Sequence, residues 1–494
     1  MNGPKNLMPE FESPWVYDTV AKTLSDGFWV LNASGTMDAI VVGTVRANYD
    51  LGFVDFTKPV KDGGVITGIG ASAFNGNKVV RDVRLPDTLK TIADYAFSGC
   101  TSLTNVVPCI PQSVTSVGRQ AFYACSALAS DVRIGFGAEP CTFGIHPFNG
   151  CSSVRDAQVG PQVTALPDYF FNGATSLTNV TLHADVESIG QYAFTGCSAL
   201  RTVTPFLPSA LTSIGLQAFY NCTSLAGALV LGTSGRPVTF SGNWQFGITE
   251  ITNAVLGAGV TAVPDYCFKQ SKLQNVEMEA VRTIGTDAFR ECKSLRSAVL
   301  PKTLESIPSA AFMSCSELQD VGSPFLPPAL TNVGWGAFYD CGKLTVPLVL
   351  EAAKKRDIAL PSTAQFGLLP TAEIVIGRYQ TMLTSQMFNM CTSVRRLKFK
   401  GKPTYQSGTF ASWTARQAIV YLPRDNAEWM GMLNDAKLVT PWDSLTVDVR
   451  ETFFDVFGPN EPVPYGLASA SFNPPNQWVT KWNPNANGTK LVFR

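Results

Sequence analysis

The stretch that decides the fold of this chain is TSLTNVTLHADVESIGQYAFTGCSALRTV, residues 175–203. Apolar and polar residues alternate between Leu177 and Leu182, which predicts a short strand with one buried face. After a turn, Ile189 points inward again, and we expect Phe194 to lie on a single helical turn. A unit of this size cannot close a hydrophobic core alone, so it must stack on similar units.

The same pattern recurs along most of the 494 residues, with a phenylalanine at a fixed place in each copy. Successive phenylalanines are separated by 21 to 28 residues. Such a period predicts a solenoid of about fifteen stacked coils, with parallel strands on one face and the aromatic rings inside. The repeat phenylalanines are Phe74, Phe97, Phe122, Phe148, Phe171, Phe194, Phe219, Phe246, Phe268, Phe289, Phe312, Phe338, Phe366, Phe388 and Phe410.

Nine of the twelve cysteines, Cys197 and Cys222 among them, stand three residues after a repeat phenylalanine. Other copies have Ala174, Ser271 or Thr249 at this position, which indicates a small buried slot that a free thiol can fill. Cys109, Cys141 and Cys267 fall outside this position and cannot be paired from the sequence. No C-x-x-C pair is present, so we expect no zinc site and no extensive disulfide framework.

The recurring pattern L-x-x-V-x-L-P…V-x-x-I-G-x-x-A-F-x-x-C-x-x-L resembles the BspA-like (Treponema-type) class of leucine-rich repeats over about residues 65–423. The coils at Phe246 and Phe366 depart from it, since they lack the alanine before and the cysteine after the ring. The resemblance implies a leucine-rich-repeat solenoid with a short C-terminal β/helix cap at 424–445. It also implies roles in adhesion to host or partner surfaces.

The flanking regions carry no repeat. Residues 1–64 contain three strand-like runs. We expect them to form a β-rich N-terminal cap or attachment region, because the apolar face of an uncapped terminal coil would be exposed to water. Residues 446–494 form an extension rich in Pro, Asn and aromatic residues. We expect it to be a small β element or an arm that contacts a partner.

A longer period is superposed on the short one. Three Pro-x-x-Pro segments, at 108–111, 205–208 and 324–327, each precede a coil that ends in Ala-Phe-Tyr. Each of these is followed by an enlarged coil, and duplication of a four-coil block explains the arrangement. We expect the extra residues to project as hairpins, where repeat proteins often bind partners. The enlarged coils are residues 130–146, 226–247 and 345–367.

Composition excludes several classes of partner. The 38 basic and 38 acidic residues cancel, which disfavours binding to nucleic acid. No run approaches the roughly 20 apolar residues of a membrane helix, and the N-terminal residues lack the apolar core of a Sec signal. The only histidines, His146 and His183, belong to no metal or nucleophile motif. We therefore expect no enzymatic activity, no metal and no cofactor.

Candidate partner-binding residues come from the enlarged coils, from one aromatic and from the extension. The alternatives are edge packing for the aromatics and a solvated loop for the charge run. The candidates are Trp244 and Arg236 in the second enlarged coil, Trp335, the run Lys354, Lys355 and Arg356 in the third, and Trp478 and Trp482 in the extension.

Two functions compete at this stage. The first is a non-enzymatic scaffold that binds a protein or glycan surface through its solenoid face and edge insertions. The second is a structural virion protein of a phage, that is, a fibre, decoration or tail-associated protein. Its terminal regions would hold it in the assembly, next to other virion subunits or to further copies of the same chain in a homo-oligomer. Both place the protein on an extracellular surface or a virion.

Overall fold

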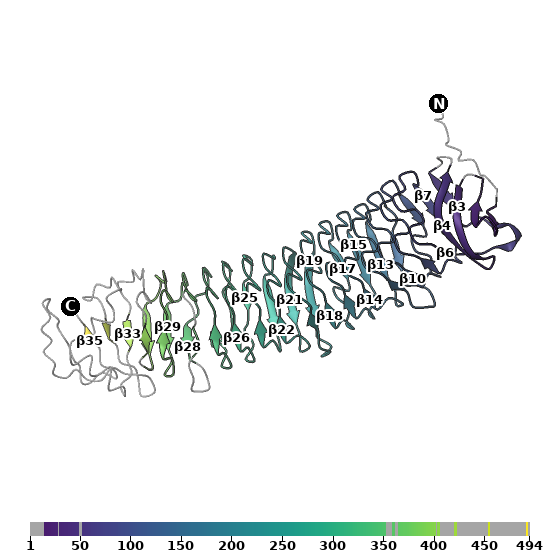
Figure 1. Ribbon diagram of the computed structural model, residues 1–494. Helices are drawn as coiled ribbons and strands as arrows, with labels where there is room; N and C mark the ends of the chain where they lie inside the picture. Colours follow the sequence, from purple (N-terminus) through teal and green to yellow (C-terminus); the bar gives the residue numbers. More distant parts are fainter. Residues whose placement is uncertain are drawn as a thin grey trace, which may run out of the picture. The chain divides into compact units, whose positions relative to one another are not determined.

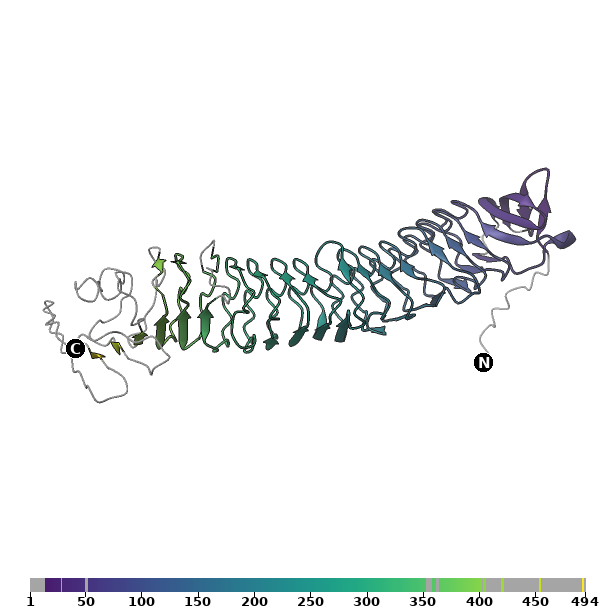
Figure 2. The same ribbon diagram turned by 90° about the horizontal axis from the view of Figure 1, so that it is seen from below.

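The computed structural model describes residues 14–27, 29–48, 52–351, 358–360, 364–401, 403–405, 419–421, 453–454 and 491–492. The chain divides into two compact units, Met1–Ala226 and Gly227–Arg494. In each unit, successive turns of the chain stack with their strands side by side, as Figures 1 and 2 show from two directions. The fold is a parallel-strand solenoid of about 14 turns, which confirms the predicted class.

Each turn of unit 1 contributes one longer and one shorter strand, and strands of each kind pair in parallel with those of neighbouring turns. The longer strands form two ladders, one of β5 (Phe53–Asp55), β7 (Asp82–Arg84) and β9 (Asn105–Val107), the other of β11 (Val132–Ile134), β13 (Asp156–Val159), β15 (Asn179–Leu182) and β17 (Thr202–Thr204). The shorter strands also form two ladders, one of β6 (Ile66–Ile69), β8 (Thr91–Ile92), β10 (Ser116–Val117) and β12 (Thr142–Phe143), the other of β14 (Ala165–Leu166), β16 (Ser188–Ile189) and β18 (Ser213–Ile214).

Unit 2 repeats this arrangement. Its longer strands are β19 (Ala226–Leu231), β21 (Glu250–Leu256), β23 (Asn275–Met278) and β25 (Ser297–Ala298), followed by β28 (Leu348–Leu350), β29 (Glu373–Ile376), β31 (Arg396–Phe399) and β33 (Ile419–Tyr421). Its shorter strands are β20 (Thr239–Phe240), β22 (Ala262–Val263), β24 (Thr283–Ile284), β26 (Ser306–Ile307), β27 (Asn332–Val333), β30 (Met382–Leu383) and β32 (Thr404–Tyr405). Two further strands, β34 (Phe453–Phe454) and β35 (Leu491–Val492), extend the β33 sheet.

The N-terminal part of unit 1 is an antiparallel sheet, β1 (Val16–Asp18), β2 (Thr23–Ser25), β3 (Trp29–Thr36) and β4 (Ala39–Asn48), and β4 pairs in parallel with β6. A short 3-10 segment, Lys61–Gly63, follows. Trp15 stacks on Phe56 at 5.3 Å, and Trp29 lies edge-on to Phe74 at 5.9 Å. These aromatic rings cover the first phenylalanine of the repeat.

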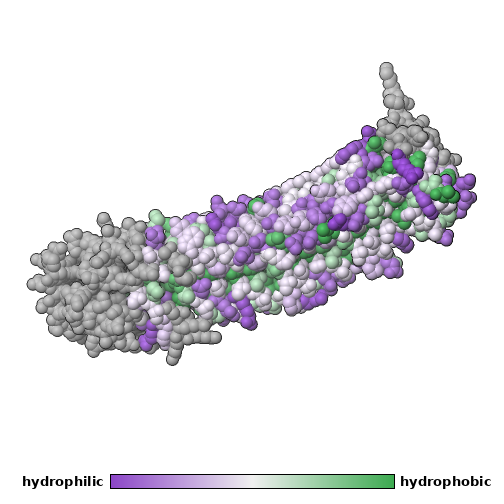
Figure 3. All heavy atoms as spheres, in the orientation of Figure 1, coloured by the Kyte–Doolittle hydropathy of each residue, from purple (hydrophilic) through white to green (hydrophobic). Residues whose placement is uncertain are grey.

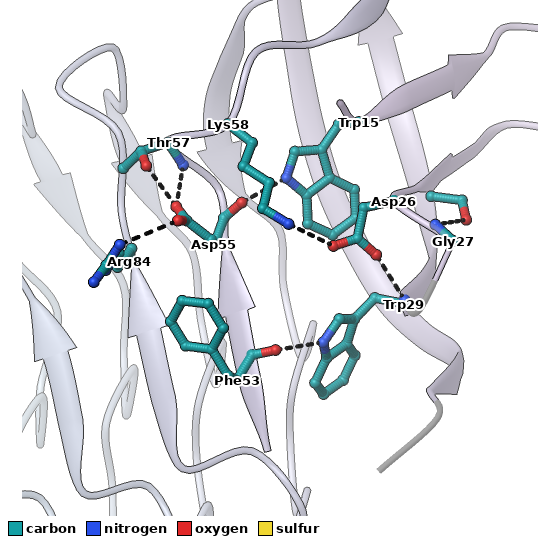
Figure 4. A network of polar contacts seen from close by, with 10 residues as sticks. Trp15, Asp26, Gly27, Trp29, Phe53, Asp55, Thr57, Lys58 and Arg84 are labelled. Carbon is teal, nitrogen blue, oxygen red and sulfur yellow. Dashed lines mark hydrogen bonds and ion pairs between the residues drawn. The ribbon is translucent and has the colours of Figure 1, made fainter. Parts of the chain in front are cut away.

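Trp15, which precedes β1, and Trp29 of β3 are both anchored through their indole N–H groups, as Figure 4 shows. Trp15 donates to the Asp55 carbonyl and Trp29 donates to the Phe53 carbonyl, each at 2.7 Å. Asp26, which is almost fully buried, accepts from the Trp29 backbone N–H at 2.9 Å and lies 3.7 Å from the Lys58 ammonium. The buried polar groups of this region therefore have partners, as a stable interior requires.

The phenylalanines form the interior of both units. The fourteen from Phe74 to Phe388 are at most 1% exposed. Neighbouring rings within a unit stack nearly parallel at 5.1 to 6.3 Å between centroids, for example Phe97 on Phe122 at 5.1 Å. The fifteenth repeat phenylalanine, Phe410, lies outside the described residues. The structure therefore describes fourteen of the fifteen rings on which the expected number of coils was based.

The expected helical turn around the phenylalanine is wrong. The residues two before and two after the ring have positive φ, as Tyr192 (55°) and Gly196 (74°) show, and this interrupts a right-handed helix. The turn instead donates hydrogen bonds to the next level, with Phe194 N–H bonded to the Ala218 carbonyl at 2.8 Å. Backbone groups that a helix would pair internally thus hold consecutive turns together.

The cysteine slot is buried, and it also has a hydrogen-bonding role that the sequence does not reveal. Each of the nine thiols donates to the carbonyl of the phenylalanine one level back, as Cys197 does to Phe171 at 3.2 Å and Cys222 to Phe194 at 3.1 Å. All twelve cysteines are free and buried, including Cys109, Cys141 and Cys267. Burial raises the pKa of the Cys197 thiol to about 12, which keeps it protonated as a donor.

The prediction of hairpins in the enlarged coils is also wrong, because the described parts of these coils form loops and not paired antiparallel strands. In the first, β11 and β12 belong to different parallel ladders, and the extra residues lie in the loop 135–141 between them. In the second, residues 233–237 form the corresponding exposed loop between β19 and β20. In the third, residues 352–357 lie outside the described residues.

Candidate recognition surface

In most turns the side chains two residues before and one residue after the phenylalanine are at least partly exposed, although Asp287, Ala310 and Ser98 at these places are buried; we call this the phenylalanine-turn surface. In unit 1 it carries aromatic residues at several consecutive levels: Tyr95, His146, Tyr169 and Tyr192 two before the ring, and Tyr123 one after it. The same place in other turns holds Ser72, Gln217 or Ala310, also with positive φ. The positive φ at this position is thus a property of the repeat, whereas the aromatic side chains occur only in some turns.

These aromatic side chains stack on one another along the solenoid of unit 1. His146 lies 4.1 Å from Tyr169 with an angle of 10° between the ring planes, and Tyr169 lies 4.7 Å from Tyr192 at 16°. Tyr123 meets His146 edge-on at 6.5 Å. We call His146, Tyr169 and Tyr192 the aromatic row.

Arg119 and Tyr95 extend the phenylalanine-turn surface of unit 1 beyond the aromatic row. The Arg119 guanidinium lies 4.9 Å from the centre of the Tyr95 ring, a cation–π distance. The five levels from Tyr95 to Tyr192 correspond to about 20 Å at the spacing of neighbouring strands. Rigid, partly exposed aromatic side chains with an arginine nearby are the composition that interface hot spots favour.

Stacking determines which chemistry the row can offer. Each ring turns a face toward its neighbour in the row, so edges and hydroxyl groups face solvent. Among the described residues, neither the Tyr169 nor the Tyr192 hydroxyl has a hydrogen-bond partner. Burial, and then the neighbouring Tyr192, raise the pKa of Tyr169, so its hydroxyl is a donor at neutral pH.

The surroundings of His146 favour its neutral form. Its Nδ1 lies 2.8 Å from the side-chain nitrogen of Asn149, and an amide NH2 group can only donate a hydrogen bond. Burial lowers the pKa of His146, Asp168 opposes this shift, and Arg119 adds to it. Tyr123 and Tyr169 are the other ring neighbours of His146.

We expect the His146 imidazole to titrate below its ordinary pKa of about 6.5. Since the unfolded chain then binds the proton more readily, this group's contribution to stability is present above 6.5 and is lost as pH falls through the folded-state value. An NMR titration of the ring protons, assigned with a His183→Gln variant, measures this. A midpoint at or above 6.5 would contradict the described environment, and Asn149→Ala should move the midpoint upward.

Unit 2 has a second polar-aromatic cluster on its phenylalanine-turn surface. Trp244 stacks on Tyr266 at 5.1 Å with only 3° between the planes, and the Lys269 ammonium lies 5.1 Å and 4.9 Å from the two ring centres. Lys269 and Arg290 both pair with the nearly buried Asp287, at 3.0 Å and 3.2 Å. The predicted anchor Trp244 is thus half-buried and packed against the next turn.

Gly247 explains how Trp244 reaches this position. A Cβ atom at Gly247 would lie 2.6 Å from the Trp244 ring, so only glycine lets the indole fold back over the turn. The sequence W-Q-F-G therefore marks a packed turn. Edge packing, the alternative that sequence reasoning left open for Trp244, accounts for these contacts.

The residue between Trp244 and Phe246 has an unusual environment. Gln245 is fully buried, and neither its amide nitrogen nor its amide oxygen has a hydrogen-bond partner. Gln365 occupies the same place before Phe366, and its oxygen accepts from the Thr384 hydroxyl at 3.4 Å. The residue at the position of Thr384 one turn after Gln245 is Pro264, which has no hydroxyl.

Replacing Gln245 by methionine is expected to raise the free energy of unfolding by about 1–2 kcal/mol, because the change removes an unpaired buried amide while keeping its length. Urea unfolding measures the change. The matched variant Gln365→Met removes a partnered amide and should not stabilise the protein. Equal effects at the two positions would contradict the different environments described for the two glutamines.

The other predicted residues are spread along the chain. Trp335 is 42% exposed, on the phenylalanine turn of Phe338, and Arg236 lies in the exposed loop of the second enlarged coil. The structure does not bring these two together with Trp244. Lys354, Lys355, Arg356, Trp478 and Trp482 lie outside the described residues. On the face shown in Figure 3, apolar residues are interspersed with polar ones.

Sequence reasoning missed the aromatic row. A signal for it existed, because aligning the turns on their phenylalanines places His146, Tyr169 and Tyr192 in one column at consecutive levels. In the part of the chain that the structure describes, no group of three or more His, Cys, Asp or Glu side chains could hold a metal ion. No helix within the described residues is both long enough and apolar enough to span a bilayer.

The repeated turn, with its two parallel ladders and internal rings, defines a leucine-rich-repeat solenoid. The model of the BspA type leucine rich repeat region, in six copies, matches residues 67–157, 134–233 and 240–353. These matches cover more than half of the sequence, and the chain belongs to this family. The predicted family is thus confirmed.

The chain is similar to several solved structures of leucine-rich repeat proteins. A leucine-rich repeat protein from Bacteroides ovatus is 18% identical, with a TM-score of 0.51, over 81% of this chain and 95% of that one. A leucine rich cell surface protein from Faecalibacterium prausnitzii is 22% identical, with a TM-score of 0.42, over 77% and 95%. The leucine rich repeat protein of T. pallidum is 24% identical, with a TM-score of 0.35, over 40% and 87%. No curated protein matches the sequence. The similarity to the Bacteroides structure supports the fold alone.

Proposed function

We propose that this protein is a non-enzymatic recognition scaffold that binds a protein or glycan surface, with the aromatic row of unit 1 as its main contact. The single observation that carries the proposal is the stack of His146, Tyr169 and Tyr192, with unengaged tyrosine hydroxyls at its edge. Tyrosine contributes large contact area at small entropic cost, which suits a site that must bind another surface. The exposed Trp335 and the loop that carries Arg236 are proposed as secondary contacts.

The proposal has a direct test in the double variant Tyr169→Ala, Tyr192→Ala. Alanine is compatible with this backbone, since Ala310 occupies the same place with a φ of 53°. Binding of the full chain to fibronectin, fibrinogen and mucin, each before and after enzymatic deglycosylation, is measured by surface plasmon resonance. We expect at least one surface to be bound, and the double variant to weaken that binding about a hundredfold, as loss of two hot-spot side chains does.

The matched control is Gln217→Ala, which alters the same repeat position one turn beyond Tyr192. It should leave binding unchanged. Loss of binding after deglycosylation assigns the ligand to the glycan, and retention assigns it to the protein. If the double variant binds every surface as tightly as the unaltered chain, the aromatic row is not the recognition site.

We also propose the division of the chain that the sequence suggested: a cap at 1–64, the solenoid at 65–423, a C-terminal cap at 424–445 and an extension at 446–494. The contacts of Trp15 and Trp29 with Phe56 and Phe74 support the first boundary. Most of the last two segments lies outside the described residues. Limited proteolysis with mass spectrometry tests the boundaries, which predict first cleavage near residue 445.

The virion protein remains the second candidate, and it rests on the sequence alone. It predicts a stable oligomer by size-exclusion light scattering, whereas a simple adhesin predicts a monomer. Deleting residues 446–494 should then abolish assembly and leave the solenoid folded. Assembly that survives this deletion would contradict the role given to the extension.

A further inference from the structure

The balanced charge of the chain hides a strong local imbalance. Residues 374–424 contain eight basic residues and no acidic residue. The basic residues are Arg378, Arg395, Arg396, Lys398, Lys400, Lys402, Arg416 and Arg424. In a chain with only 15% charged residues, a segment of this length with eight basic and no acidic residues can form a basic surface.

The strand β31 places several of these cations on one surface of unit 2. Its exposed Arg396 and half-buried Lys398 alternate with the buried Leu397 and Phe399. Successive side chains on one face of a strand are about 6.6 Å apart, and Lys400 continues the same alternation. We call Arg378, Arg395, Arg396, Lys398 and Lys400 the basic strip.

Two carboxylates order the strip without neutralising it. Glu373 of the neighbouring strand β29 lies 2.7 Å from the Arg396 guanidinium and 3.2 Å from the Lys398 ammonium. Glu351 lies 2.6 Å from the Lys400 ammonium. Five cations and two carboxylates leave a net charge of +3 on the described residues of this surface. A carboxylate shared between two cations fixes their positions, which favours binding of a ligand with regularly spaced charges.

Arg395 is the cation most available to a ligand. It is exposed, and within the described residues its guanidinium donates only to the Thr392 and Val394 carbonyls, at 3.2 Å and 3.1 Å. It forms no ion pair among these residues. A guanidinium without a carboxylate partner can donate two parallel hydrogen bonds to a carboxylate or sulfate group.

The geometry points to an acidic polysaccharide as the ligand of the basic strip, bound through carboxylate or sulfate groups that repeat along the polymer. The modest net charge of +3 and the ion pairs of Arg396, Lys398 and Lys400 distinguish this surface from a nucleic-acid site. Such a site tracks consecutive phosphates with unpaired cations and stacks bases on exposed aromatic rings. The described part of the strip carries no exposed aromatic ring. This inference does not depend on the aromatic row, which belongs to unit 1.

The test uses the full chain and labelled polymers: dextran sulfate, polygalacturonate, neutral dextran and a single-stranded oligothymidylate. Fluorescence anisotropy measures binding at several salt concentrations. We expect both acidic polysaccharides to bind, with affinity that falls as salt rises, and neutral dextran not to bind. The double variant Arg378→Gln, Arg395→Gln should weaken binding about tenfold and flatten the salt dependence by about one unit per lost contact.

The matched control is Arg282→Gln, Arg296→Gln, which removes the same charge from unit 2 outside the strip. Arg296 stands seven residues after Phe289, as Arg395 does after Phe388. The control should bind like the unaltered chain, and Arg378→Lys, Arg395→Lys should retain most of the affinity. Circular dichroism verifies that all variants are folded.

Three results would overturn the inference. The first is no binding of either acidic polysaccharide. The second is an equal loss in the control variant, which would mean that net charge alone acts. The third is tighter binding of the oligothymidylate, which would assign the strip to nucleic acid. The Tyr169→Ala, Tyr192→Ala variant should bind dextran sulfate normally, so failure here is distinguishable from failure of the proposed function.

Discussion

Replacing Phe194 by alanine should lower the free energy of unfolding by about 3–5 kcal/mol, the usual range for losing a buried phenylalanine ring. The ring is fully buried and lies 5.1 Å from Phe219 and 6.2 Å from Phe171. Its loss leaves a cavity between two levels that cannot close, because the backbone spacing is fixed by hydrogen bonds from turn to turn. Urea unfolding followed by circular dichroism measures the change.

The control for this prediction is Tyr192→Ala, two residues earlier on the outside of the same turn. It should cost about 1 kcal/mol or less, since partly exposed side chains contribute little to stability. Because coils contact only their neighbours, we also expect the unfolding curve of Phe194→Ala to broaden. A loss below about 1 kcal/mol would mean that Phe194 is not in the interior.

Replacing Gly190 by alanine is expected to cost about 3 kcal/mol, at the upper end of what overpacking usually does. An added Cβ would lie 2.5 Å from the Asp168 backbone nitrogen and 2.5 Å from the Pro167 carbonyl carbon of the preceding turn. Backbone atoms cannot rotate away as a flexible side chain can, so the two turns must separate. Thermal unfolding of the variant measures this.

Gly196→Asn is the matched control in the same turn. Gly196 has a φ of 74°, but the nearest atom to an added Cβ is 4.0 Å away, and Asn221 occupies the same place in the next turn with a φ of 59°. We expect a change of less than about 1 kcal/mol, because asparagine tolerates this conformation. Equal costs at the two glycines would contradict the close approach of turns at Gly190.

The period of the phenylalanines was sufficient to predict the stacking, because a side chain that recurs every 21 to 28 residues must occupy equivalent interior positions. The conformation of the turn was not predictable in the same way. Left-handed residues are usually signalled by glycine, whereas here Tyr192, Gln217 and Ala310 adopt that conformation. Hydrogen bonds to the next turn fix it, and they are invisible in a single repeat.

The candidate surface was harder to predict for a related reason. Tryptophans and charge runs attract attention in a sequence, yet Trp244 packs on Gly247 of its own turn and on Tyr266 of the next turn. The aromatic row consists of residues 23 apart that become neighbours only through stacking. Surfaces of a solenoid are built across turns, so single stretches of sequence show little of them.

The central claim is a dry interior in which rings and free thiols are stacked from turn to turn, and the reactivity of the twelve cysteines tests it most directly. Without reductant, we expect a thiol reagent such as Ellman's to find almost no reactive cysteine in the folded protein, because all twelve are buried. In guanidinium it should find nearly all twelve. Rapid reaction of most thiols in the folded protein, or their absence after denaturation, would contradict the account.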